Sequence, residues 1–151
     1  MDCSSMTELL LCEKAGIKGE EIMFTSNQTT AAEYVKAKSL GAVINLDDIT
    51  HIKYFDENAG LGDLISFRYN PGPLKGGNSI IGKPEEAKYG LTAEQMFEAF
   101  KIVKEKGAKR FAINTMVASN ELNPDYYVET ADILFKLGAD ICEELGMVLE
   151  V

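Results

Sequence analysis

The stretch that decides the fold runs from Arg68 to Gly90 and reads RYNPGPLKGGNSIIGKPEEAKYG. It follows a predicted strand over 64–70, LISFRYN, and it ends just before helix signals resume at Thr92. A connection of about 20 residues inside a compact domain is usually functional or disordered. Because Asn70-Pro71 breaks the strand, Arg68 stands at the strand's carboxyl end. The stretch therefore predicts a functional loop after an apolar strand, and the alternative is an ordinary surface loop.

The rest of the chain alternates short apolar runs with stretches of helical period. Further strands are predicted near 22–25, 42–46, 110–115 and 147–151, with a strand end at the N-terminus. Each predicted helix begins at a residue that can cap it and carries an apolar stripe. The helices are expected from Ser4 or Ser5 to Gly16, from Thr29 or Thr30 to Gly41 (stripe Ala32, Val35, Leu40), from Asp47 or Asp48 (stripe Ile49, Ile52, Phe55), from Thr92 to Gly107 (stripe Met96, Phe97, Phe100, Val103), and from Pro124 to Leu145.

This alternation predicts an α/β protein with a parallel sheet covered by helices. Right-handed crossovers curl such a sheet toward a barrel or an open wound sheet. A complete (β/α)₈ barrel takes ~250 residues, and this chain has 151. We therefore expect one domain over 1–151, a partial (β/α)₈ TIM barrel with about five parallel strands. No glycine-rich phosphate fingerprint follows the first strand, which disfavours a Rossmann fold.

Composition excludes several classes of function. A formal net charge of -9 disfavours a nucleic-acid surface, and no apolar run is long enough for a membrane span. Asp2 follows Met1 directly, so no signal peptide is predicted and a cytoplasmic location is expected. The three cysteines, Cys3, Cys12 and Cys142, are odd in number and lack metal-like spacing. They predict reduced thiols, with neither a disulfide framework nor a metal site.

Several motifs occur in one order along nearly the whole chain. They are D-C-x-S-x-x-E-L within Met1–Leu9, I-x-F-x-x-N at 22–27, a short strand at 43–47, R-x-N-P with K-Y-G in the 68–90 loop, and the strand at 111–119. In this order they resemble the fold-type III pyridoxal-phosphate (PLP) decarboxylases, and among these they are most similar to diaminopimelate decarboxylase. The resemblance implies an alanine racemase-like barrel, PLP as the cofactor of the intact parent, and an amino-acid substrate.

The resemblance also assigns cofactor-binding residues. Asp2 matches an aspartate beside the lysine that holds PLP, although a solvated N-terminus is the alternative. Arg68 matches an arginine under the cofactor ring, and Ser119 matches a serine near the cofactor, although it can equally start a turn. Met116 stands where most members have the histidine that stacks on the ring. Methionine packs on an aromatic face but donates no hydrogen bond.

The matched region lies between two further family motifs. It begins after Y-A-x-K-A, whose lysine binds PLP covalently, and it stops before a G-G-G phosphate loop and a C-terminal β-domain. The resemblance thus implies an internal fragment of a diaminopimelate decarboxylase, which makes lysine with loss of CO₂. We expect the fragment to hold no catalytic residue, to bind no PLP and to be inactive alone. The alternatives are a non-catalytic α/β domain that binds a ligand or self-assembles, and another fold-type III enzyme such as ornithine or carboxynorspermidine decarboxylase or alanine racemase.

A partial barrel leaves sheet edges and an inner face open. We expect the edges near 22–25 and 147–151, and we expect Ile44, Ile65, Phe67 and Ile113 on the inner face. Apolar surfaces of this kind promote pairing with another chain. A homo-oligomer is therefore expected.

Overall fold

Five strands and five α-helices alternate along residues 1–77 and 82–150, the part of the chain that this computed structural model describes. The strands are β1 (Asp2–Cys3), β2 (Met23–Ser26), β3 (Val43–Leu46), β4 (Leu64–Tyr69) and β5 (Arg110–Thr115). The helices are α1 (Met6–Ala15), α2 (Ala31–Ser39), α3 (His51–Ala59), α4 (Ala93–Glu105) and α5 (Pro124–Leu145). Residues 78–81 of the predicted loop, and residue 151 of the strand predicted over 147–151, lie outside the described part.

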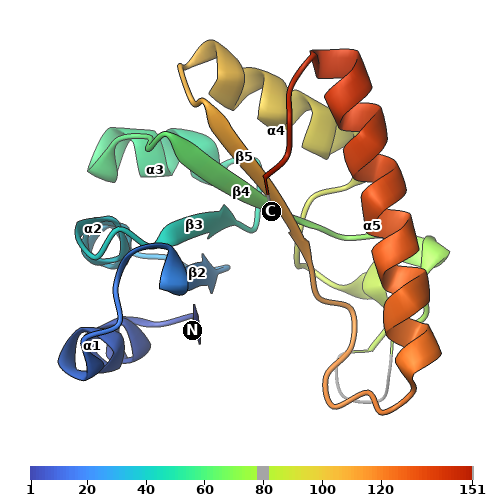
Figure 1. Cartoon of the computed structure of the whole chain (residues 1–151), viewed down its shortest axis with the longest axis horizontal. Helices are drawn as coiled ribbons and strands as arrows, with labels where there is room; N and C mark the ends of the chain where they lie inside the picture. Colours follow the sequence, from blue (N-terminus) through green and yellow to red (C-terminus); the bar gives the residue numbers. More distant parts are fainter. Residues whose placement is uncertain (78–81, 151) are drawn as a thin grey trace.

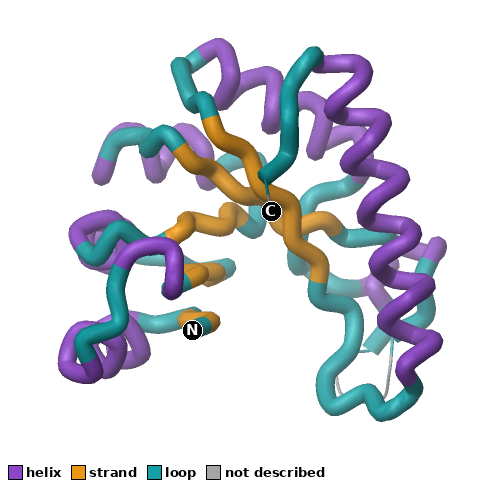
Figure 2. Tube along the Cα trace, viewed as in Figure 1, coloured by secondary structure: helices purple, strands orange, loops and turns teal. Residues whose placement is uncertain are grey.

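The strands form one parallel sheet in the order β1-β2-β3-β4-β5. The sheet fans out as part of a barrel wall, and the helices lie along its outer side (Figures 1 and 2). Beyond β5, Leu149 makes a parallel bridge to Phe111, so the chain starts a sixth position in the sheet. The predicted partial (β/α)₈ barrel is confirmed.

Local signals fix the helix ends. Thr30 and Thr92 each accept a hydrogen bond from the third residue of their helix, whose Glu33 or Gln95 side chain bonds back to the cap. These reciprocal bonds satisfy backbone N–H groups that lack a partner inside the helix. Gly16 ends α1 with φ of 76°, a conformation that favours glycine. The predicted bounds of α5 are confirmed at both ends.

The face of α2 was predicted wrongly. Tyr34 and Ala37 are its buried residues, whereas Val35 of the predicted stripe is 50% exposed. The Tyr34 ring packs against the Phe55 ring of α3, with the centroids 4.9 Å apart. A tyrosine therefore supplies the core contact that the pattern assigned to a valine, because the larger ring reaches the neighbouring helix.

The two faces of the sheet differ from the prediction as well. Ile44, Ile65 and Phe67 lie in the core between the sheet and the helices, and Ile113 packs against that core. The ring centroids of Phe67 and of Phe100 on α4 are 4.9 Å apart. Because alternate residues of a strand face the same way, this side of the strands is the outer one, which the helices cover. The expectation that these four residues line the inner face is wrong.

Polar side chains occupy the inner face instead. In the register of β2, β3 and β4, Thr25, Asn45 and Ser66 stand side by side. The Asn45 amide donates to the Thr25 hydroxyl at 3.0 Å, and the Ser66 hydroxyl donates to the Asn45 carbonyl oxygen at 2.7 Å. Asn45 and Ser66 are almost fully buried, so each polar group needs this partner. On β2, β3 and β4 these three polar residues therefore lie on the side of the sheet opposite the helices.

One predicted edge of the sheet is also wrong. The segment near 22–25 is an interior strand, because β1 pairs with β2 on one side and β3 pairs with it on the other. The first edge is therefore β1, only two residues long. At the other edge the predicted terminal strand is present in the described residues as the Leu149 bridge. Self-association through these edges stays a prediction.

Candidate functional site

The long loop is fastened to the carboxyl end of β4 at both of its ends. The Asn70 amide donates to the carbonyls of Pro84 and Tyr89, at 3.0 and 2.8 Å, and its oxygen accepts from the Gly72 N–H. The Asn70 N–H bonds the Leu91 carbonyl, and the Leu91 N–H bonds the Arg68 carbonyl, both at 2.8 Å. Asn70 thus holds the beginning and the end of the loop together.

Gly90 is required for this closure. Its φ is 79°, and a Cβ atom there would lie 2.9 Å from the Arg68 carbonyl oxygen. Its N–H donates to the Asp47 carbonyl at 3.1 Å, so the loop also reaches the end of β3. Only glycine combines this backbone conformation with so close an approach. The N-P and K-Y-G elements of the sequence are therefore two halves of one clamp.

The Arg68 side chain is held beside this clamp by three contacts. Its Nη1 donates to the Asp47 carboxylate at 3.1 Å, and its Nη2 donates to the Met116 carbonyl at 3.1 Å. The guanidinium carbon lies 5.0 Å from the centroid of the Tyr89 ring. The side chain of Asp47 is 2% exposed and that of Arg68 is 14% exposed. Three different segments therefore fix a positive charge at the carboxyl end of the sheet.

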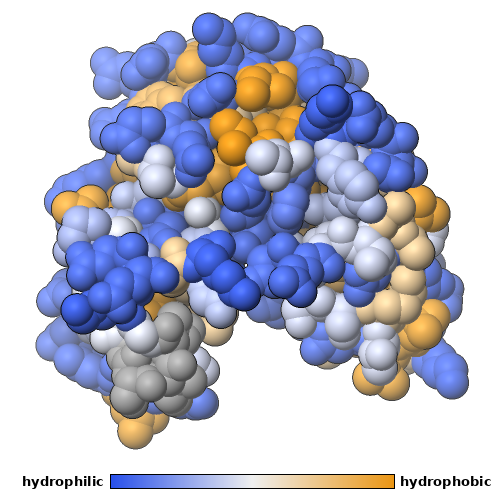
Figure 3. Space-filling view, turned by 180° about the vertical axis from the view of Figure 1, so that it is seen from behind, coloured by the Kyte–Doolittle hydropathy of each residue, from blue (hydrophilic) through white to orange (hydrophobic). Residues whose placement is uncertain are grey.

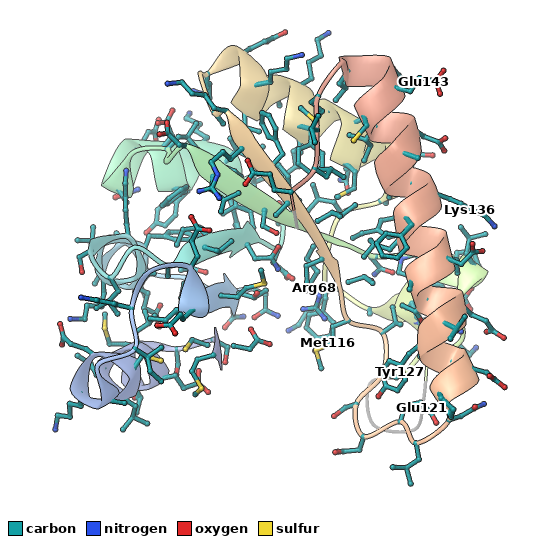
Figure 4. All side chains as sticks on the ribbon, viewed as in Figure 1. Arg68, Met116, Glu121, Tyr127, Lys136 and Glu143 are labelled. Carbon is teal, nitrogen blue, oxygen red and sulfur yellow. The ribbon has the colours of Figure 1, made fainter. Side chains whose placement is uncertain are left out.

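A cavity of about 410 Å³ opens at this end of the strands. It is lined by Asp2, Cys3, Ser4, Thr25, Arg68, Asn114, Thr115 and Met116. Figure 4 shows Arg68 and Met116 side by side at the inner edge of the sheet, whereas Lys136 and Glu143 lie far along α5. From the opposite side the molecule has a notch at its lower margin, bordered above by hydrophilic surface (Figure 3). The cavity combines a cation, a carboxylate, hydroxyl and amide groups, and one exposed thioether.

The amino end of the strands is held by ion pairs. Arg110 donates to Glu20 at 2.5 Å and to Glu150 at 2.8 Å. The hydrogen bond from Arg110 holds the pKa of Glu20 below its usual range, and Glu20 in turn raises the pKa of Arg110. Glu20 precedes β2, whereas Arg110 begins β5, so the contact joins the amino ends of two strands that are not neighbours in the sheet.

Three of the four residues predicted to bind the cofactor come together. Asp2 from β1, Arg68 from β4 and Met116 after β5 all line the cavity. Ser119 lies further along the segment between β5 and α5, where its hydroxyl accepts from Asn120 at 3.4 Å, and it is not among the lining residues. Asn114, two residues before Met116, also lines the cavity. The cofactor roles of all these residues stay predictions.

Sequence reasoning missed two residues of this site. Asp47 is predicted only as a strand end or a helix start, and Tyr89 only as part of the loop closure. Both contact the Arg68 guanidinium. A signal for Asp47 was present, because it directly follows the apolar run 43–46, where a side chain faces the carboxyl end of a parallel sheet.

Glu8 belongs to a helix cap and not to the cavity wall. Glu8, in the first turn of α1, accepts from the Ser4 N–H at 2.6 Å and from the Ser5 hydroxyl at 3.0 Å. These bonds lower its pKa, so it is an ionised helix-capping group. No group of three or more His, Cys, Asp or Glu side chains within 1–77 and 82–150 is arranged to hold a metal ion. In the same residues, no helix is both long and apolar enough to cross a membrane.

Comparison with known proteins identifies the family. The model of the "Pyridoxal-dependent decarboxylase, pyridoxal binding domain" family matches residues 1–151. The chain belongs to this family. Among curated relatives, Protein TabA of Pseudomonas amygdali pv. tabaci is 32% identical over 150 residues, covering 99% of this chain and 35% of the relative. Diaminopimelate decarboxylase of Thermoplasma acidophilum is 26% identical over 149 residues, covering 97% of this chain and 36% of the relative.

Solved structures agree on the fold. Diaminopimelate decarboxylase from M. jannaschii, in co-complex with L-lysine, superposes with a TM-score of 0.85 at 21% identity, covering 99% of this chain and 36% of that one. The chain thus spans about a third of the length of the relatives it matches.

Proposed function

We propose that the chain forms part of a PLP-dependent amino-acid decarboxylase of the diaminopimelate decarboxylase type, and that it supplies one wall of the cofactor site. The observation that carries the proposal is the cavity of about 410 Å³ that unites Asp2, Arg68 and Met116 at the carboxyl end of the strands. Active sites of barrels built this way lie at that end. The diaminopimelate decarboxylases among the relatives support meso-diaminopimelate as the substrate.

The lining residues fit PLP in kind and in size. Cofactor sites are concave, with volumes of roughly 300–1,000 Å³ and a few placed polar groups. PLP, when bound, withdraws electrons from the α-carbon of an amino acid and so allows a carboxylate to leave as CO₂. Arg68 offers a fixed positive charge, since Asp47 and the Met116 carbonyl prevent its rotation. The Met116 side chain, 47% exposed, offers an apolar surface for a ring. Asp2 offers a carboxylate to the same cavity.

This wall does not provide a group for covalent attachment. No lysine is among the residues that line the cavity in the described part of the chain. The residues of the wall therefore bind, orient and exclude water, and the covalent step belongs to a lysine elsewhere in the complete enzyme. We accordingly propose that the chain alone is inactive.

The proposal is tested by measuring CO₂ release from a full-length protein that carries this chain. Release is expected with meso-diaminopimelate, and it should exceed the release from L-lysine, L-ornithine and L-arginine by at least about tenfold, a difference of ~1.4 kcal/mol in transition-state binding. A preference for one of the other amino acids would select another decarboxylase of the family. Folded, PLP-loaded protein without CO₂ release from any of them would contradict the proposal and favour a non-catalytic binding domain.

A second experiment examines the 151-residue chain alone. After incubation with PLP and reduction with borohydride, peptide mapping is expected to show scattered, substoichiometric labelling of exposed lysines. The reason is that the cavity wall contains no lysine. One lysine labelled to completion, together with decarboxylase turnover, would show that the chain is a complete enzyme.

A further inference from the structure

The thiols of Cys3 and Cys12 lie in direct contact. Their Sγ atoms are 3.5 Å apart, and the pair shares a hydrogen bond. The two residues are 1% and 2% exposed. A disulfide has an S–S distance of about 2.05 Å, so the sulfur atoms need to approach by only about 1.5 Å. The third cysteine, Cys142, lies on α5 and is half-buried.

The elements that carry the two thiols are consecutive. Cys3 ends β1, and Cys12 lies in the last turn of α1, which begins at Met6. β1 is an edge strand of two residues, paired only with β2. Short edge segments open locally at low free-energy cost. Such opening gives a small reagent access to thiols that are otherwise covered.

We propose that Cys3 and Cys12 form a redox modification site, at which a hydroperoxide converts the two thiols into an intrachain disulfide. One thiolate attacks the peroxide, forming an S–O bond while the O–O bond breaks and hydroxide leaves. The second thiol then attacks this sulfur, so that the S–S bond forms, the S–O bond breaks and water leaves. In sum, two thiols and one H₂O₂ give one disulfide and two H₂O. The sulfur atoms are oxidised and the peroxide is reduced.

The surroundings slow the reaction of the two thiols. Burial raises the pKa of the Cys3 thiol to about 11, with further contributions from the Cys12 hydrogen bond and the Glu8 carboxylate. The N-terminal ammonium acts in the opposite direction. Because the thiolate is the reactive form, little of it exists near neutral pH. The site therefore responds slowly and tolerates brief exposure to oxidant.

The cross-link has a structural consequence at the proposed cofactor wall. Cys3 lines the cavity next to Asp2 and Ser4, and the disulfide ties this part of the wall to α1. Closing a loop of about ten residues restricts the unfolded chain. The oxidised protein is therefore expected to melt roughly 5 to 10 °C above the reduced protein, and dithiothreitol should reverse the shift.

Mass spectrometry of the whole, folded chain tests the proposal. Trypsin releases residues 1–14 as one peptide that contains both thiols, because Lys14 is the first cleavage site, and Cys142 falls in a separate peptide after Lys136. After treatment with H₂O₂ and removal of the excess with catalase, peptide 1–14 should lose the mass of two hydrogen atoms. Dithiothreitol should restore it. Oxygen added to Met1 or Met6 raises the mass and is easily told apart.

Three variants complete the design. Cys142→Ser should keep both the mass loss and the rise in melting temperature, whereas Cys3→Ser and Cys12→Ser should each abolish them. Circular dichroism of the reduced variants verifies that they fold. The proposal is overturned if peptide 1–14 gains oxygen at a thiol without losing hydrogen, if the cross-link joins Cys142 instead, or if oxidation lowers the melting temperature.

Discussion

Phe100→Ala is expected to lower the free energy of unfolding by about 3–5 kcal/mol, the range for large-to-small changes of a buried aromatic residue. The Phe100 ring is fully buried and meets two strands at once. Its centroid lies 4.9 Å from that of Phe67 and 6.0 Å from that of Phe111, both in edge-to-face geometry. The loss combines the removed apolar area, the cavity and the two ring contacts. Equilibrium unfolding in urea, followed by circular dichroism, measures it.

The matched control is Phe135→Ala on α5. This phenylalanine is 72% exposed, so the same change of side chain should alter the free energy of unfolding by less than about 0.5 kcal/mol. A loss at Phe100 as small as the one expected at Phe135 would contradict the assignment of the β4 and β5 aromatic residues to the helix-covered face. A large loss at Phe135 would indicate that Phe135 is covered, for example by a second copy of the chain.

The second large effect concerns the ion pair between Asp47 and Arg68. Arg68→Met is expected to cost roughly 2–3 kcal/mol, because it leaves the buried Asp47 carboxylate without its cation. Asp47→Asn should cost less, roughly 1–2 kcal/mol, since the guanidinium keeps the Met116 carbonyl, the Tyr89 ring and the solvent of the cavity. The double variant should be less destabilised than the sum of the two, by roughly 1–2 kcal/mol. A double-mutant cycle in urea gives this coupling energy.

A surface ion pair provides the control for this cycle. Lys136 and Asp132 are paired at 2.6 Å on α5, but their side chains are 73% and 60% exposed. The cycle of Asp132→Asn and Lys136→Met should yield a coupling energy of at most about 0.5 kcal/mol. If the Asp47–Arg68 coupling is equally small, the pair does not anchor the cavity wall, and Arg68 is free to reorient.

The architecture could be read from local patterns. The capping boxes at Thr30 and Thr92, the proline and glycine that bound α5, and the apolar runs between them are all encoded within a few residues. Such signals act through neighbouring backbone groups, so they need no knowledge of distant contacts. The order of strand and helix, in turn, admits few arrangements besides a parallel sheet with outer helices. The motif order pointed to the residues that the cavity brings together, with Ser119 as the exception.

The assignment of faces needed the tertiary structure. In the runs 43–46 and 64–69 the polar residues Asn45, Ser66 and Arg68 share one side of the strands, but the sequence does not show whether that side faces the helices or the interior of the barrel. The rings of Phe67 and Phe100 decide it, and they leave Thr25, Asn45 and Ser66 to the inner side. The hydrogen bonds among these three side chains form only when their strands are in register. The register is a property of the folded sheet.

The partners of the site residues were decided in the same way. Asp47, Arg68 and Tyr89 belong to three segments, and nothing in any one segment specifies the other two. The sequence does not relate Cys3 to Cys12, whereas in the fold β1 and α1 place their sulfur atoms 3.5 Å apart. The sequence by itself determined the elements, their order and the family, because those depend on local chemistry and on motif spacing. The tertiary structure alone decided which charges, rings and thiols meet, because such contacts arise only when the chain closes its loops and the sheet curves.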